Sequence, residues 1–233
     1  QNSYAGRRNE LYEVNSRSKN ALLVGGLGPY RGGKRGGMAS AKTTLHTLPT
    51  GPMSLNEATR AFNTTRNRPV YVARAFLIIR DRGVLVLDRV IAPRGGGQPV
   101  EARAYTPHDA TFSQTDVLIE GEFETARMTF ASNVGATLSR AVALMTFPRP
   151  DPPTMLRWQT NRKGKSVVMA SLLSRGSEPV ELGVVTDGED ENVIVVPHHV
   201  GAVLRQHGRG VQRFQPDADL DAVVQVELPV RAL

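Results

Sequence analysis

Residues 21–37, ALLVGGLGPYRGGKRGG, bring together an apolar run, seven glycines and three cations, which are residue types that can bind phosphate. A phosphate-binding loop needs G-x-x-x-x-G-K, then Ser or Thr to ligate magnesium, then a helix that faces the phosphates. Residues 28–34 fit the first part, but Arg35 takes the hydroxyl position and glycines 36–37 stand where the helix should begin. Because each glycine costs a helix about 0.8–1 kcal/mol, the sequence argues against nucleotide hydrolysis.

The residue types of the same loop also suit an anion other than a nucleotide phosphate. Glycines let backbone amides approach a ligand, and Arg31, Lys34 and Arg35 are predicted to bind carboxylate or sulfate groups, with a plain surface loop as the alternative. Residues 1–35 carry seven Lys or Arg and two Glu, in a chain of formal net charge +7. Clustered cations concentrate polyanions. We therefore expect an acidic partner near this end, unless the charge is simply solvated.

The sequence motifs for a metal or cofactor site are weaker than those for an anion site. The chain has no cysteine, which excludes disulfides and cysteine-ligated metals. His198 and His199 are adjacent, and adjacent strand residues face opposite sides. The acidic residues of 187–191 lack the spacing of a calcium loop. We expect no cofactor, although the sequence leaves a structural divalent metal open, and we expect Trp158 in the core rather than as a platform for a sugar.

The segments that position these residues have the sequence pattern of β-strands. Residues 70–92, VYVARAFLIIRDRGVLVLDRVIA, hold two β-branched and aromatic runs around Asp81-Arg82-Gly83. This pattern predicts a hairpin with strands at 69–80 and 83–92, because glycine supplies the positive φ that such turns need. Arg74 is expected to pair with Asp88 across the hairpin in a structural role.

Further apolar runs predict strands throughout the chain, separated by Gly, Pro and Asp turns. They lie at 100–105, 116–123, 124–130, 155–160, 166–173, 180–186, 192–197 and 222–228. One short helix is expected at 54–62, with Ser54 as its N-cap and Glu57 three residues later. The fold class predicted is all-β, an antiparallel multi-stranded β-sandwich with one short helix.

We expect one domain over residues 1–233, with a break between sub-layers near 148–153, and a flexible turn at 92–99. No apolar stretch approaches the roughly 18 residues that a membrane helix needs. The chain begins with Gln1, which suggests a processed product or a piece of a longer protein.

Three motifs occur in an order that resembles the C-terminal β-sandwich region of heparinase II/III-like polysaccharide lyases. The first is YEVNSRSKNALLVGG (12–26), where the family has S-R-x-H-N and then a strand that ends in V-D-G. The second is LNEATRAF (55–62) and the third is the hairpin at 70–92. The resemblance is densest over residues 12–92 and only strand-like beyond them.

The resemblance implies a lyase that cleaves uronic-acid glycans by β-elimination, outside the cytoplasm in the periplasm or secreted. It implies that Arg17 and Asn20 recognise the substrate carboxylate and that Tyr12 binds substrate. Lys19 replaces the family's histidine, so a role as cation, or as base if burial lowers its pKa, is all that carries over. The family's α/α toroid, the expected partner that holds the catalytic tyrosine, is absent from this chain, so the chain alone is expected to be inactive.

Two other functions remain open at this point. One is a non-catalytic module that binds carbohydrate or another polyanion. The other is a β-rich structural or assembly protein whose basic, glycine-rich first 37 residues form an arm that touches nucleic acid. No membrane partner is expected in any of the three.

Overall fold

The computed structural model describes the backbone and side chains of most of the central part of the chain. These residues are 21–29, 41–48, 51–63, 68–80, 82–93, 96–142, 151–161, 163–180 and 182–184. The backbone alone is described for five short strands: β2 (Arg31–Gly32), β3 (Gly37–Met38), β15 (Val193–Val195), β16 (Gly201–Leu204) and β17 (Val223–Gln225).

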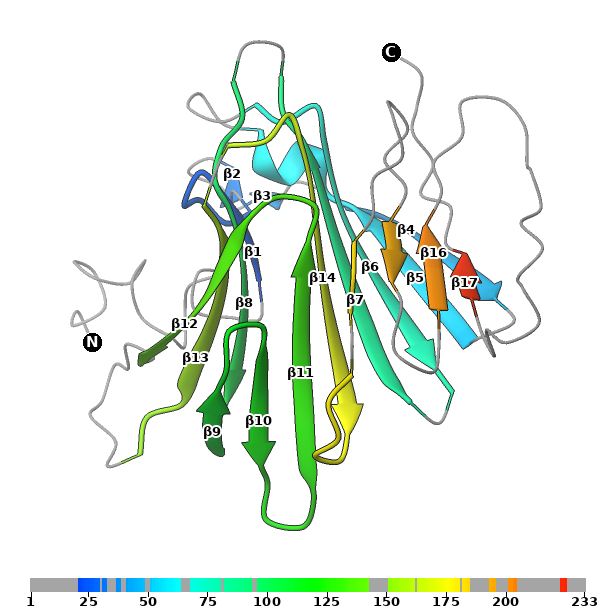
Figure 1. Cartoon of the computed structure of the whole chain (residues 1–233). Coiled ribbons are helices and arrows are strands. Elements are labelled where there is room, and N and C mark those ends of the chain that lie inside the picture. The colour runs from blue at the N-terminus through cyan, green and yellow to red at the C-terminus, as the bar shows by residue number, and fades with distance from the viewer. Residues whose placement is uncertain are drawn as a thin grey trace.

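Two antiparallel sheets form the sandwich (Figure 1). The small sheet has the order β1 (Leu22–Val24), β8 (Val100–Thr106), β13 (Thr154–Thr160) and β12 (Ala136–Val142). The large sheet has the order β4 (Lys42–Leu48), β5 (Gly51–Glu57), β6 (Tyr71–Ile79), β7 (Gly83–Ile91), β14 (Ser166–Arg175), β11 (Thr125–Ser132), β10 (Asp116–Glu120) and β9 (Asp109–Phe112). The predicted all-β sandwich is thus confirmed. Strands β15 to β17 form a separate sheet in which β16 and β17 are parallel, and β2 pairs with β3.

The predicted hairpin is confirmed as β6 and β7, in antiparallel register from Tyr71 opposite Ile91 to Ile79 opposite Gly83. The strands expected at 100–105, 116–123, 124–130, 155–160, 166–173, 192–197 and 222–228 are confirmed as β8, β10, β11, β13, β14, β15 and β17, with β10 ending at residue 120. Strands β2, β3, β4, β9, β12 and β16 were not expected.

The helix expected at 54–62 is wrong over its first half. Residues 51–57 form β5, paired on both sides with β4 and β6, and only Thr59–Phe62 form a short 3₁₀ helix, η2, without a side-chain cap. Met53 and Leu55 alternate with more exposed residues and are buried, so pairing and burial on a sheet outweigh a helical capping pattern. The Thr59 hydroxyl accepts a hydrogen bond from the Val72 amide at 3.0 Å and ties η2 to β6.

Apolar side chains cover both faces of the large sheet. One cluster fills the space between the sheets and includes Val72, Val90, Phe130 and Trp158. A second cluster lies on the outer face of the large sheet; among its residues Leu77 and Leu85 are fully buried. Val180, Leu182 and Val184 pack against this outer cluster, although the described residues of 180–186 form no strand, contrary to prediction.

The connection at 92–99 has no regular structure where it is described. Most of the break expected at 148–153 lies outside the described ranges, and the single-domain assignment stays a prediction. Nothing among the described residues forms a helix long and apolar enough to cross a membrane.

Candidate functional site

Six of the seven predicted site residues lie outside the described ranges: Tyr12, Arg17, Lys19, Asn20, Lys34 and Arg35. The seventh, Arg31, is described only by its backbone in β2. Their roles therefore stay predictions. The described residues instead show the strand and the turn next to them in the sequence. Strand β1 begins two residues after Asn20, and the turn after β1 precedes Arg31.

Strand β1 is a firmly held edge of the small sheet. Leu22, Leu23 and Val24 are each buried, and they pair with Ala102, Glu101 and Val100 of β8. The carbonyl of Ala21, the residue after Asn20, accepts a hydrogen bond from the Arg103 amide at 2.9 Å. Ala21, which directly follows Asn20, is thus held next to β8.

The turn after β1 shows why two of the glycines are there. Val24 and Leu27 exchange backbone hydrogen bonds of 2.9 and 3.1 Å, which forces Gly25 and Gly26 to φ values of +60° and +73°, a region that favours glycine. The Gly25 amide donates to the Pro99 carbonyl at 2.8 Å. The Gly25 amide is therefore used within the fold.

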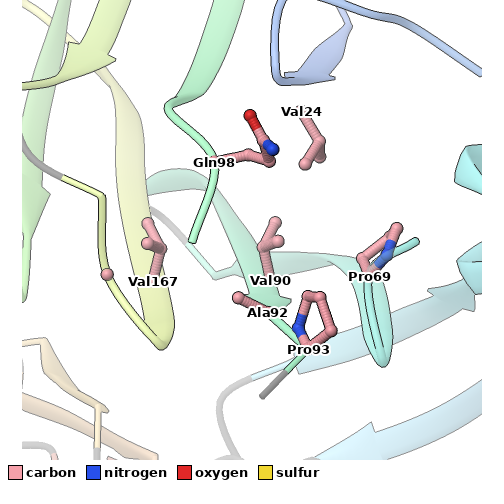
Figure 2. Close-up of a pocket in the computed structure, with 8 residues that line it drawn as sticks. Val24, Pro69, Val90, Ala92, Pro93, Gln98 and Val167 are labelled. Carbon is pink, nitrogen blue, oxygen red and sulfur yellow. The ribbon is translucent and has the colours of Figure 1, made fainter. Parts of the chain in front are cut away.

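A small apolar hollow lies beside this turn (Figure 2). It is lined by Val24, Pro69, Val90, Ala92, Pro93, Gln98, Gly164 and Val167. Gln98 supplies the polar side chain in Figure 2, and the space holds no more than about one water molecule. A sugar ring does not fit, so the hollow is not a substrate site.

A charged cluster lies next to β1 on the outer face of the small sheet. Glu101 on β8 is buried and accepts hydrogen bonds from Arg103 on the same strand and from Arg157 on β13. The Nε and Nη2 atoms of Arg157 lie 3.0 and 3.1 Å from Oε1 and Oε2 of Glu101, and Nη2 also donates to Gln159 at 3.2 Å. Two cations therefore surround one carboxylate, on the sheet that β1 joins.

The protonation states in this cluster follow from its hydrogen bonds. Burial alone would raise the pKa of Glu101, but the hydrogen bonds and charges of Arg157 and Arg103 outweigh burial and hold that pKa below its usual value. The hydrogen bond to Glu101 likewise raises the pKa of Arg157. At neutral pH the carboxylate of Glu101 and the guanidinium of Arg157 are both charged. Glu101, ionised and paired with two arginines, is unsuited to proton transfer.

We expect Glu101→Gln to lower the free energy of unfolding at pH 7 by about 1.5–3 kcal/mol, the range for hydrogen bonds to charged groups. Because folding depresses the pKa of Glu101, its contribution is present above the unfolded pKa of about 4.3 and is lost as pH falls through the folded value. Urea denaturation of both proteins at pH 7 and pH 3 measures this, and the difference between them should shrink at pH 3. Glu124→Gln, in an exposed pair with Arg175, is the control; a Glu101→Gln difference equal at both pH values would contradict the assignment.

The sequence did not predict this cluster. Glu101 and Arg103 alternate with apolar residues on one strand, and Arg157 does the same on another, so each strand alone predicts which residues share a face. That Arg103 lies opposite Arg157 depends on the pairing of β8 with β13, which is distant in sequence.

Two structural expectations are confirmed. Arg74 lies opposite Asp88, with Nε to Oδ1 at 2.6 Å and Nη2 to Oδ2 at 2.8 Å. Burial alone would lower the pKa of Arg74, but the charge and hydrogen bond of Asp88 raise it. Trp158 is buried in the cluster between the sheets, with its ring centroid 5.5 Å from that of Phe130.

Within the described ranges, no three His, Asp or Glu side chains gather as metal ligands would. His198, His199 and the acidic segment 187–191 lie outside those ranges.

The comparisons with known proteins agree with this architecture. No protein-family model matches the sequence, and no curated protein matches it. Among solved structures, a mutant of the heparan sulfate lyase HepC from Pedobacter heparinus superposes on 81% of this chain with a TM-score of 0.56 and 10% identity. A heparinase III gene product superposes on 83% with a TM-score of 0.60 and 9% identity, and a further heparinase III on 80% with a TM-score of 0.58 and 12% identity.

The match covers only part of those proteins. This chain spans 30%, 31% and 29% of their respective lengths. At such low identity the comparison concerns the fold. The expected resemblance is confirmed at that level: the chain has a β-sandwich fold that is also found in heparinase III structures.

Proposed function

We propose that this chain is the β-sandwich part of a polysaccharide lyase that cleaves uronic-acid-containing glycans by β-elimination. One observation carries the proposal: the chain superposes over 80–83% of its length on heparinase III structures with TM-scores of 0.58–0.60. The order of the motifs at 12–26, 55–62 and 70–92 supports it independently.

The proposed reaction removes the proton at C5 of the uronate and expels the glycosidic oxygen at C4, which leaves an unsaturated uronate. Charge that develops on the substrate carboxylate must be stabilised by groups already in place. We assign this to Arg17, which can bind a carboxylate through two hydrogen bonds, and to Asn20, a neutral donor. Lys19 adds a cation, or acts as base where burial lowers its pKa.

Other residues are assigned to substrate binding: Tyr12, Arg31, Lys34 and Arg35. Support for an acidic substrate comes from the excess of cations in residues 1–35. The proposal includes no cofactor. It places the protein in the periplasm or outside the cell, and it assigns the remaining catalytic groups to a helical toroid of the same polypeptide.

The test is the ultraviolet absorbance of newly formed unsaturated uronate. The complete product of the gene and this chain alone are each incubated with alginate, heparan sulfate, chondroitin and hyaluronan, and only the complete product is expected to form the unsaturated uronate. In it, Arg17→Ala or Asn20→Ala should lower turnover at least about tenfold, which is about 1.4 kcal/mol of transition-state stabilisation.

Arg82→Ala is the matched control, because Arg82 is an exposed arginine in the turn between β6 and β7. Wild-type turnover in both site variants would remove Arg17 and Asn20 from the site. Binding of acidic glycans without any turnover by the complete product would instead support a non-catalytic module. Salt-sensitive binding to nucleic acid together with self-association would support an assembly protein.

A further inference from the structure

An exposed row of apolar side chains crosses the inner face of the large sheet beyond the small sheet. We call it the apolar strip; it consists of Leu45, Phe76, Ile78, Val84, Val86 and Leu173. Leu45 is 79% exposed, Phe76 39%, Ile78 51% and Leu173 40%, and Val84 and Val86 are partly exposed. In Figure 1 the small sheet lies on one side of the large sheet, while β5 and β6 extend away from it.

The strand register makes the strip continuous. Ile78 lies opposite Val84, and Val84 lies opposite Leu173. One row further along, Phe76 lies opposite Val86, and Ser54 separates Phe76 from Leu45. The strip therefore runs across β4, β5, β6, β7 and β14, about 19 Å at the usual spacing of about 4.8 Å between strands. Cross-strand neighbours on one face touch each other, so five of these residues form one continuous surface, and Leu45 lies on the same face beyond Ser54.

The strip is also an extension of the core between the sheets. Val84 and Leu173 continue, through Met128, to the buried Val117, and Val86 leads through Ser171 to the buried Phe130. Contiguous exposed apolar surface of this kind marks an interaction site on a soluble protein. Phe123 and Val142, by contrast, are 89% and 63% exposed but lie outside the strip.

The other described faces are unsuited to pack a second body through apolar contacts. The outer face of the large sheet is already closed, because Leu77, Leu85 and Leu87 are no more than 1% exposed. The outer face of the small sheet carries the charged cluster of Glu101 and Arg157. Among the described surfaces, the apolar strip is thus the one that offers a hydrophobic interface.

We propose that the apolar strip is the docking surface for another domain of the same polypeptide, which packs an apolar face against Phe76 and Ile78. The occupant, though not the strip itself, rests on the proposed function. It is argued from size: this chain spans 29–31% of each heparinase structure that it matches, so such chains contain other bodies large enough to cover the strip. Interfaces between domains of one chain bury about 600–1,500 Å², so the apolar strip, about 19 Å long, forms the apolar centre of such an interface rather than all of it.

Hydroxyl-radical footprinting of the complete gene product and of this chain alone tests the proposal. Oxidation of Phe76 is expected to be at least about fivefold slower in the complete product, because an interface core excludes water. Phe123 is the matched control and should react equally in both. Equal reactivity of Phe76 in both proteins would overturn the proposal, as would a gene that encodes only these 233 residues. Protection of Phe76 that rises with the concentration of this chain alone would assign the strip to a second copy.

Substitutions then separate docking from folding. Phe76→Ser combined with Ile78→Thr should lower the melting temperature of this chain alone by only a few degrees, because the two side chains are already 39% and 51% exposed. In the complete product the same pair should speed proteolytic cleavage between domains about tenfold, whereas Phe123→Ser combined with Val142→Thr should not. Equal cleavage rates in both pairs would overturn the docking.

These readouts do not depend on catalysis. Protection of Phe76 in a complete product that forms no unsaturated uronate would overturn the proposed function alone. A reactive Phe76 in an active lyase would overturn only the docking surface.

Discussion

Arg74→Met is expected to lower the free energy of unfolding by about 3–5 kcal/mol, because it leaves the carboxylate of Asp88 buried without its partner. The Asp88 side chain is 3% exposed and that of Arg74 18%, and two hydrogen bonds of 2.6 and 2.8 Å join them. The nearby amide of Asn56 donates to the Arg74 carbonyl at 3.3 Å. Chemical denaturation at pH 7 measures the loss.

The double variant Arg74→Met, Asp88→Leu provides the sharper test. Removing both charges leaves no buried ion to compensate, so much of the lost stability should return. Arg175→Met is the control, since Arg175 and Glu124 form their pair at an exposed position and should contribute little. A double variant no more stable than Arg74→Met would show that packing rather than charge explains the loss.

Gly83→Ala is expected to cost about 3–5 kcal/mol and to loosen the junction between β7 and β14. The Cβ of an alanine at this position would lie 2.0 Å from the Leu173 carbonyl oxygen, and the φ of +153° is one that side chains rarely adopt. Backbone strain costs about 1–3 kcal/mol and overpacking a further 1–3 kcal/mol. Because Gly83 pairs with Ser174, the strands must separate to accept the methyl group. Thermal and urea denaturation measure the effect.

Substitutions at two other glycines separate the cost of backbone strain from the cost of the steric clash. Gly176 has a φ of +88° with nothing within 4 Å of an added Cβ, so Gly176→Ala should show strain alone. Gly96 has open space and no positive φ, so Gly96→Ala should be nearly neutral. Similar losses for Gly83→Ala and Gly176→Ala would contradict the clash.

The central hairpin could be predicted from sequence because its signals are local. Apolar runs on either side of Gly83 set the turn, the turn sets the register, and the register places Arg74 opposite Asp88. The helix expected at 54–62 failed because β4 and β6, which pair with residues 51–57, are not visible to a local pattern. Strands β4 and β12 were missed because they are edge strands rich in polar residues, with little apolar alternation.

The residues of the candidate site also fall into two groups: those that a local sequence motif predicts and those that only the pairing of distant strands brings together. The motif order predicted Arg17, Lys19 and Asn20, which lie outside the described residues and stay predictions. The cluster of Glu101, Arg103 and Arg157 depends on a pairing between strands that are distant in sequence, and no local pattern contains it. Sequence predicted residue types on a face, whereas the structure was needed to show which faces meet.

The central position of β14 in the large sheet limits when this sheet can form during synthesis of the chain. In the large sheet it lies between β7 and β11, although β8 to β13 separate it from β7 along the chain. Until the ribosome has released residues 166–175, the half formed by β4 to β7 and the half formed by β9 to β11 each present a long open strand edge. Such edges invite pairing with other chains, so the interval before β14 emerges is when the nascent chain most needs protection by a chaperone.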